Sequence, residues 1–251
     1  MQKNDLNPIY RNLSLILEAQ TAIKYLRLGL GNIQKISAKN DFYHPVFLYL
    51  SGGIERLLKV MLCLNYQERE SSLPSFRKLL RNNNGHDLVF LKGELAEIIA
   101  NNRELLSQED YDIIISDRLV IQIFDVLSEF GKRGRYFNLD AVMGTAQDYN
   151  VQSEWNKIEK QVGIEYFGID KYNDLVFATG KLDFLFQTTN ELIVSSLEKL
   201  FRALTRLILK NKFSNNGNYL TFEVEVFTDI SDNDLGKTDY NKFQIYEWVR
   251  R

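Results

Sequence analysis

The segment VFLYLSGGIERLLKVMLCLN, residues 46–65, carries the clearest structural signal in this chain. Its apolar residues recur every three or four positions, which is the period of one face of an α-helix. The residues on that face are Val46, Leu50, Ile54, Leu57, Met61 and Leu64, and Phe47, Leu58 and Leu62 widen it. Glu55 and Lys59 stand four residues apart, in the order that favours an ion pair along a helix. The segment therefore predicts a central helix that is packed on several sides.

Helices are also predicted on both sides of this segment. Residues 8–36 have helical spacing, with Asn7 as a cap and Pro8 in the first turn, where its missing N–H is not needed. A third helix is expected to start at Asp87 or at the preceding Asn-Gly-His, and to bury Leu88, Leu91, Leu95 and Ile98. A fourth should open at Ser107 and stop near Gly131 or Gly134. Residues 151–163 and 190–212 predict two more, whereas residues 165–187 suit a short strand or a buried helix equally.

The last forty residues have a different pattern. Leu220, Phe222, Val224 and Val226 alternate with polar residues, which is the period of a β-strand. An acidic loop at 229–239 follows, and Phe243, Ile245 and Val249 suggest a return strand. We therefore expect a mainly α protein with three parts: a bundle core at 1–140, additional helices at 141–218, and a small C-terminal β-hairpin at 219–251.

The composition is that of an ordinary globular protein. Of the 251 residues, 45% are hydrophobic and 25% are charged, so a sizeable core is available. The formal net charge of −2 gives no global reason to expect nucleic acid. The single cysteine, Cys63, lies in an apolar run and is expected to be a core residue, which suits a reducing compartment. No secretory signal or membrane-spanning stretch is evident, and we expect a cytoplasmic protein.

Four short motifs occur in a characteristic order. FYHPVFL at 42–48 is followed by GIERLLKVML at 53–62, GHDL at 85–88 and RGRY at 133–136. This order resembles the HEPN superfamily, small helical bundles in which a Glu-x-Leu-Leu-Lys helix, a Gly-His-Asp-Leu turn and a later Arg-Tyr succeed one another. The resemblance covers residues 8–140 and implies a HEPN-like helical bundle.

The resemblance implies one of two activities. Many members of the superfamily are dimeric, metal-independent ribonucleases with an Arg-x4–6-His motif, in which arginine holds the scissile phosphate and histidine moves protons. Others lack that motif and serve as binding or assembly modules beside a second protein. The resemblance thus implies a homodimer, with RNA, a nucleotide or a partner protein as ligand, in a prokaryotic defence or toxin–antitoxin setting.

The sequence departs from the ribonuclease pattern at the motif itself. Its only histidines are His44 and His86. The positions that would complete the motif hold Asn138, Leu139 and Asp140 counting from Arg133, and Asp140, Ala141 and Val142 counting from Arg135. We therefore assign no catalytic residue and favour a non-enzymatic role.

The run at 131–138 is the candidate nucleic-acid or phosphate-binding site. Lys132, Arg133 and Arg135 would hold backbone phosphates, while Tyr136 or Phe137 would stack on a base. The alternative is an ordinary helix C-terminus, where basic residues complement the helix dipole and glycine ends the helix. On physical grounds alone, an ordinary helix C-terminus is favoured over a binding site.

Other polar residues have simpler interpretations. His86 and His44 are expected to be turn and helix-entry residues, and neither has a ligand partner at metal spacing. Asp117 and Arg118 lie in an apolar helix and indicate either a self-complementary dimer contact or an ion pair inside the bundle, of which we favour the ion pair. The acidic alternation before Gly236 lacks the full spacing of a calcium loop, so a solvated loop is expected. No phosphate-binding or dinucleotide-binding glycine motif is present, and no metal or cofactor is predicted.

The favoured function is therefore a non-catalytic HEPN-like binding or assembly module. A divergent endoribonuclease that uses Arg133, Arg135 and His86 is the first alternative. The second is a structural protein-interaction module without a nucleic-acid role, in which the edge of the hairpin recruits a partner strand.

Overall fold

The computed structural model describes residues 7–75, 86–145, 148–210 and 221–242. Within these ranges the chain is mainly helical and forms no strand beyond one isolated bridge between Ser37 and Asn40. The helices are α1 (Pro8–Gln34), α2 (His44–Glu70), α4 (Leu88–Asn101), α5 (Gln108–Ile115), α6 (Arg118–Lys132), α7 (Phe137–Val142), α8 (Val151–Phe167), α9 (Ile169–Phe177), α10 (Leu182–Lys210) and α12 (Thr221–Thr228), with 3-10 turns η2 (Arg103–Leu105), η3 (Gly134–Tyr136) and η5 (Tyr240–Lys242).

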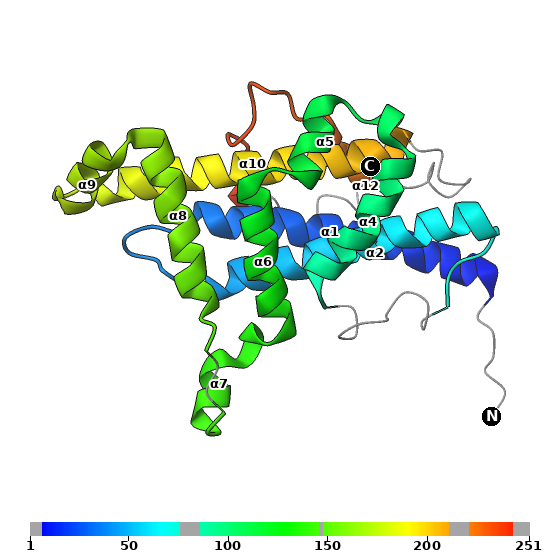
Figure 1. Ribbon diagram of the computed structural model, residues 1–251, viewed down its shortest axis with the longest axis horizontal. Helices are drawn as coiled ribbons and strands as arrows, with labels where there is room; N and C mark the ends of the chain where they lie inside the picture. The colour runs from blue at the N-terminus through cyan, green and yellow to red at the C-terminus, as the bar shows by residue number, and fades with distance from the viewer. Residues whose placement is uncertain (1–6, 76–85, 146–147, 211–220, 243–251) are drawn as a thin grey trace.

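Three long helices form the body of the molecule. Figure 1 shows α1, α2 and α10 running side by side, with α6 and α8 crossing them and α7 projecting beyond the ends of α6 and α8. The antiparallel pair α1–α2 is in close contact because glycines face leucines across it. A Cβ atom on Gly29 would lie 2.5 Å from Cδ2 of Leu50, and one on Gly53 would lie 2.9 Å from the backbone nitrogen of Leu26. The central helix predicted at 46–65 is confirmed and extends to Glu70.

The predicted caps of three helices are confirmed. Side-chain oxygens of Asn7, Asp87 and Ser107 accept backbone N–H groups of α1, α4 and α5 at 2.9, 3.0 and 3.0 Å. These short polar side chains satisfy backbone donors that a helix leaves free at its N-terminus. They fix where each helix begins.

The fourth predicted helix is broken into α5 and α6. Asp117 interrupts it, because its side chain accepts the N–H of Val120 at 2.8 Å and caps a new helix. The predicted ion pair inside the bundle is wrong: Arg118 is exposed and pairs with Glu165 of α8 at 3.4 Å on the surface. The capping role explains why an aspartate occurs at position 117, since aspartate is favoured at the start of a helix.

The ambiguous stretch 165–187 consists of helical segments joined by short connections. It holds the end of α8, all of α9 and the beginning of α10. Gly168 separates α8 from α9 with φ +79°, a left-handed conformation that favours glycine. The apolar residues here therefore belong to short helices rather than to a strand.

The predicted C-terminal hairpin is wrong in its first strand. Residues 221–228 form α12, and Phe227 is fully buried with its ring 5.2 Å from that of Phe201 on α10. Packing against a long helix outweighs the strand-like alternation, because strand propensity depends strongly on context. Leu220 and the predicted return strand at 243–249 lie outside the described residues. The segment 229–239 is a chain of turns, as expected for a loop.

Cys63 is half-buried, and burial raises the pKa of its thiol to about 11, above its ordinary value. This environment fits the packing role predicted for it, because a thiol held protonated is a poor nucleophile. Among the described helices, none combines the length and the apolar character needed to cross a bilayer.

Candidate functional site

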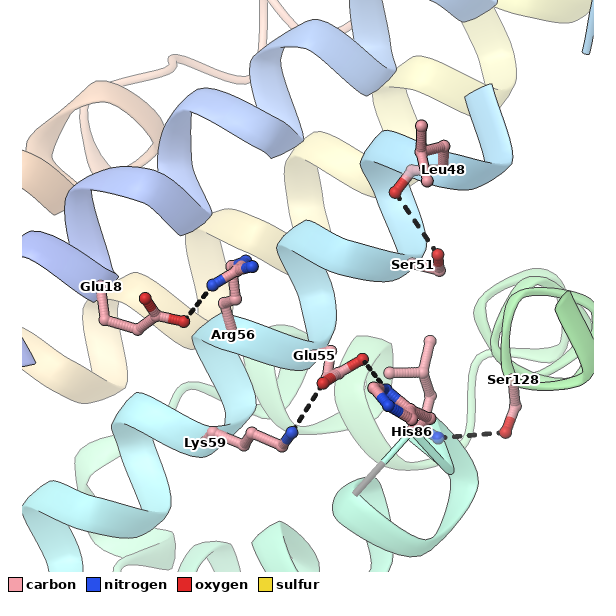
Figure 2. Close-up of polar contacts among 9 residues, drawn as sticks. Glu18, Leu48, Ser51, Glu55, Arg56, Lys59, His86 and Ser128 are labelled. Atoms are coloured by element: carbon pink, nitrogen blue, oxygen red, sulfur yellow. Dashed lines mark hydrogen bonds and ion pairs between the residues drawn. The ribbon is translucent and has the colours of Figure 1, made fainter. Parts of the chain in front are cut away.

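The structure brings three of the four sequence motifs together at one place. Glu55 on α2 accepts from Lys59 at 2.6 Å with one carboxylate oxygen, and its other oxygen lies 3.0 Å from Nδ1 of His86 (Figure 2). His86 and Asp87 form the turn that leads into α4. The last turn of α6, with Ser128, Glu129 and Lys132, packs against that turn. We call this group, together with Arg133, the α2–α4–α6 junction.

Ser128 links the turn to α6. Its hydroxyl accepts the N–H of Leu88 at 3.0 Å, and donates to the carboxylate of Asp87 at 3.1 Å. Burial alone would raise the pKa of Asp87, but hydrogen bonds from Phe90, Ser128 and Lys132 outweigh it and hold that pKa below its ordinary value. Asp87 therefore stays ionised while it caps α4.

Gly131 allows the turn to approach α6 closely. A Cβ atom at this position would lie 2.9 Å from the carbonyl oxygen of His86. A larger residue would push the turn away from the helix, so the glycine in the Gly-Lys-Arg-Gly-Arg-Tyr run has a packing reason. The described part of the Gly-His-Asp-Leu motif, from His86 to Leu88, therefore packs together with this run.

Two of the predicted phosphate-binding cations are engaged inside the junction. Lys132 lies 2.6 Å from Glu129 and 3.6 Å from Asp87. Nε of Arg133 donates to Glu129 at 2.6 Å, and its guanidinium lies 5.5 Å from the ring centre of Tyr149. Although burial opposes it, the pKa of Glu129 is lowered by its bonds to both cations. Both positive charges are therefore matched by carboxylates.

The other two predicted residues lie beyond the junction, in η3. Gly134 at its start packs against Val151 of α8, whose Cγ2 would lie 2.6 Å from a Cβ atom there. Nε of Arg135 is buried without a hydrogen-bond partner, and Tyr136 is 64% exposed. Of the four predicted residues, Lys132 and Arg133 therefore belong to the junction, and Arg135 and Tyr136 belong to η3.

The junction is balanced in charge and contains one proton-transfer group. Its carboxylates on Glu55, Asp87 and Glu129 face the cations of Lys59, Lys132 and Arg133. The side chain of His86 is 40% exposed and is oriented by the nearly buried Glu55. An oriented, accessible imidazole is the arrangement that general acid–base chemistry uses. No group of three or more metal-ligating side chains occurs in the described parts of the chain.

His44 has a separate, structural role. Its ring packs edge-on against that of Phe130 at 5.4 Å, at the start of α2. This agrees with its predicted place as a helix-entry residue.

A second concave region lies between the end of α2 and α4. This cleft of about 490 Å³ is bordered by Glu68, Glu70, Glu94 and Glu97, with Arg69 as a cation. Its excess of carboxylates makes it unsuitable for a phosphate group, because like charges repel.

Sequence reasoning missed Ser128 and Glu129. Glu129 stands three and four residues before Lys132 and Arg133, the spacing at which side chains on a helix meet, so the pairing was visible in principle. Ser128 carries no comparable signal, because its partners come from a turn forty residues away. Comparison with protein-family models, with curated proteins and with solved structures finds no match to this chain.

Proposed function

We propose that this chain is a non-catalytic, HEPN-like binding or assembly module. The motif order and the missing Arg-x4–6-His histidine support this, and so does the convergence of the Glu-x-Leu-Leu-Lys and Gly-His-Asp-Leu motifs on one junction. The prokaryotic defence or toxin–antitoxin setting rests on the resemblance alone.

The observation that carries the proposal is the charge balance of the junction. A site that holds a scissile phosphate needs cations free to neutralise it. Lys132 and Arg133 instead share Glu129, and Lys132 also faces Asp87. These residues fasten α6 to the turn before α4, which is a structural task.

The test is cleavage and binding of a mixed RNA pool in EDTA by purified protein. We expect no cleavage above background, and weak binding that the Arg133→Ala/Arg135→Ala double variant leaves unchanged. A Glu129→Gln variant removes the carboxylate that Lys132 and Arg133 share, and it should gain RNA affinity with a steeper dependence on salt. Cleavage by the wild type that disappears in the double variant would overturn the proposal.

A divergent endoribonuclease is the second candidate, and one contact favours it. Glu55 orients the ring of His86, at the turn that packs on Gly131 beside Lys132. In this case the catalytic histidine would come from the Gly-His-Asp-Leu motif and not from an Arg-x4–6-His motif. A His86→Ala variant should then abolish cleavage while the protein remains folded, as judged by its circular dichroism spectrum.

A homodimer is part of the proposal and is tested separately. Sedimentation equilibrium of the full chain distinguishes a monomer from a dimer at micromolar concentration. Deletion of residues 219–251 is not a clean test for a partner protein, because it removes Phe227 and Tyr240 from the core. If the deletion variant lost a complex, the cause could be the lower stability of its fold and not the loss of a binding surface.

A further inference from the structure

Glu159 on α8 is a partly buried acid that lies beside buried aromatic residues. Oε2 accepts the hydroxyl of Tyr43, the residue that precedes α2, at 2.8 Å, and Oε1 accepts the indole N–H of Trp155 at 2.9 Å. Each carboxyl oxygen therefore has one neutral donor. The bond from Tyr43 connects α8 to the start of α2, and the bond from Trp155 lies within α8.

The donors themselves are locked in place. Tyr43 stacks on Phe47 with ring centres 6.0 Å apart, and Phe47 meets Trp155 edge-on at 5.5 Å. Tyr43, Phe47 and Trp155 are all at most 5% exposed. The hydroxyl of Tyr43 is thereby held in place beside Glu159.

No cation accompanies this carboxyl among the groups that influence it. Glu159 raises the pKa of two phenols, those of Tyr43 and of Tyr172 on α9, and Asp41 also raises the pKa of Tyr43. The cation that α6 brings to α8, Arg118, pairs with Glu165. Thr189 is the polar residue of α10 that lies against Gly163, four positions after Glu159 on α8. On α8 itself, Lys157 pairs with Glu154.

We propose that Glu159 is a proton-sensitive fastening between α8 and the start of α2, closed when the carboxyl is neutral and loosened when it is ionised. Burial raises the pKa of Glu159 to about 7, although the bonds from Tyr43 and Trp155 oppose that rise. A charge held without a counter-ion in this environment favours states in which water reaches it. The fastening therefore responds to pH within the physiological range.

Loosening α8 reaches the residues around η3. Val151, in the first turn of α8, supports Gly134 at the start of η3, which carries Arg135 and Tyr136. The proton on Glu159 thus controls how firmly that turn is held. This inference stands whether or not the proposed binding function is correct.

The experiment measures hydrogen-exchange protection of the α8 and α9 amides in the full chain from pH 5 to pH 8.5. The intrinsic exchange rate is divided out, and amides in the middle of α10 serve as the internal reference. One proton separates the closed and open states, so protection should fall up to about tenfold per pH unit between pH 5 and pH 7. Above pH 7 it should level off, because both states are then ionised.

Two variants separate proton sensing from simple packing. Glu159→Gln should remove the pH dependence, while Glu154→Gln, an acid one turn earlier on α8, should keep the wild-type curve. Tyr43→Phe removes a donor that favours the charged form, so the fall should continue to higher pH. A merely structural role for Tyr43 would lower protection equally at every pH.

The result that overturns the proposal is protection of α8 and α9 that has the same pH dependence in the wild type and in Glu159→Gln. If the Gln variant does not fold, Trp155 fluorescence in a Trp248→Phe background replaces it as the readout. A titration near pH 7 that moves upward in Tyr43→Phe supports the proposal, and a flat titration refutes it.

Discussion

Glu198 shows how a single buried side chain can organise a segment without regular structure. It is fully buried on α10, where its two oxygens accept the N–H of Gly236 at 2.5 Å and the hydroxyl of Tyr240 at 2.7 Å. Burial raises the pKa of Glu198 although both bonds oppose the rise. The turns after α12 are thereby tied to α10.

Gly236 should tolerate no side chain in this position. It has φ +79°, and a Cβ atom would lie 2.7 Å from the carbonyl oxygen of Glu191. We expect Gly236→Ala to lower the free energy of unfolding by about 2–4 kcal/mol, from conformational strain together with the clash. Gly180→Ala is the matched control in urea denaturation: φ is +78° but nothing lies within 4 Å, so it should cost only about 1 kcal/mol. Equal losses in the two variants would show that the contact with Glu191 is unimportant.

Between elements, the contact of α1 with α2 depends on glycine. Gly53→Ala should lower the free energy of unfolding by about 1–3 kcal/mol, because the new methyl group meets the backbone of Leu26. Gly93→Ala on the exposed face of α4 meets nothing within 4 Å and should stabilise by about 0.5–1 kcal/mol through helix propensity. Urea denaturation of the pair measures both effects, and stabilisation by both substitutions would contradict the close approach.

The helix α12 is held by Phe227. We expect Phe227→Ala to cost about 3–5 kcal/mol in the free energy of unfolding, because it leaves a cavity beside Phe201. Backbone chemical shifts of residues 225–228 should be helical in the wild type. Extended values there would instead restore the strand that the sequence pattern predicts.

The sequence predicted helices well where one residue type decides the outcome. Asn7, Asp87 and Ser107 mark helix starts by their own side chains, and the apolar face at 46–65 is long enough to exclude a strand. It failed at α12, where distant packing decides, and at Asp117, whose capping role was mistaken for pairing. The candidate site could be predicted only as motifs, because the contacts of Ser128 and Lys132 with the residues before α4 join positions about forty apart, although the spacing of Glu129 from Lys132 and Arg133 already indicated their pairing.

The stability of the whole molecule should depend on pH through Glu159. Its pKa of about 7 in the folded state exceeds the value near 4.3 expected after unfolding. The stabilisation is therefore complete below pH 4 and decreases as pH rises to 7, by about 3 kcal/mol. Urea denaturation at pH 5, 6, 7 and 8 measures this, and Glu159→Gln should remove that decrease. A wild-type curve unchanged by the substitution would contradict the assignment.

The anchoring of Tyr240 also bears on how the chain is made. Tyr240 packs on Gly31, and its backbone N–H is accepted by the side chain of Gln34, 206 positions earlier. A ribosome synthesises α1 before the other described helices, yet this face of α1 is covered only after a further 206 residues have emerged. Until then the nascent chain carries an open surface on α1. This contact therefore forms late in folding, and a chain that stops before residue 240 leaves this face of α1 uncovered.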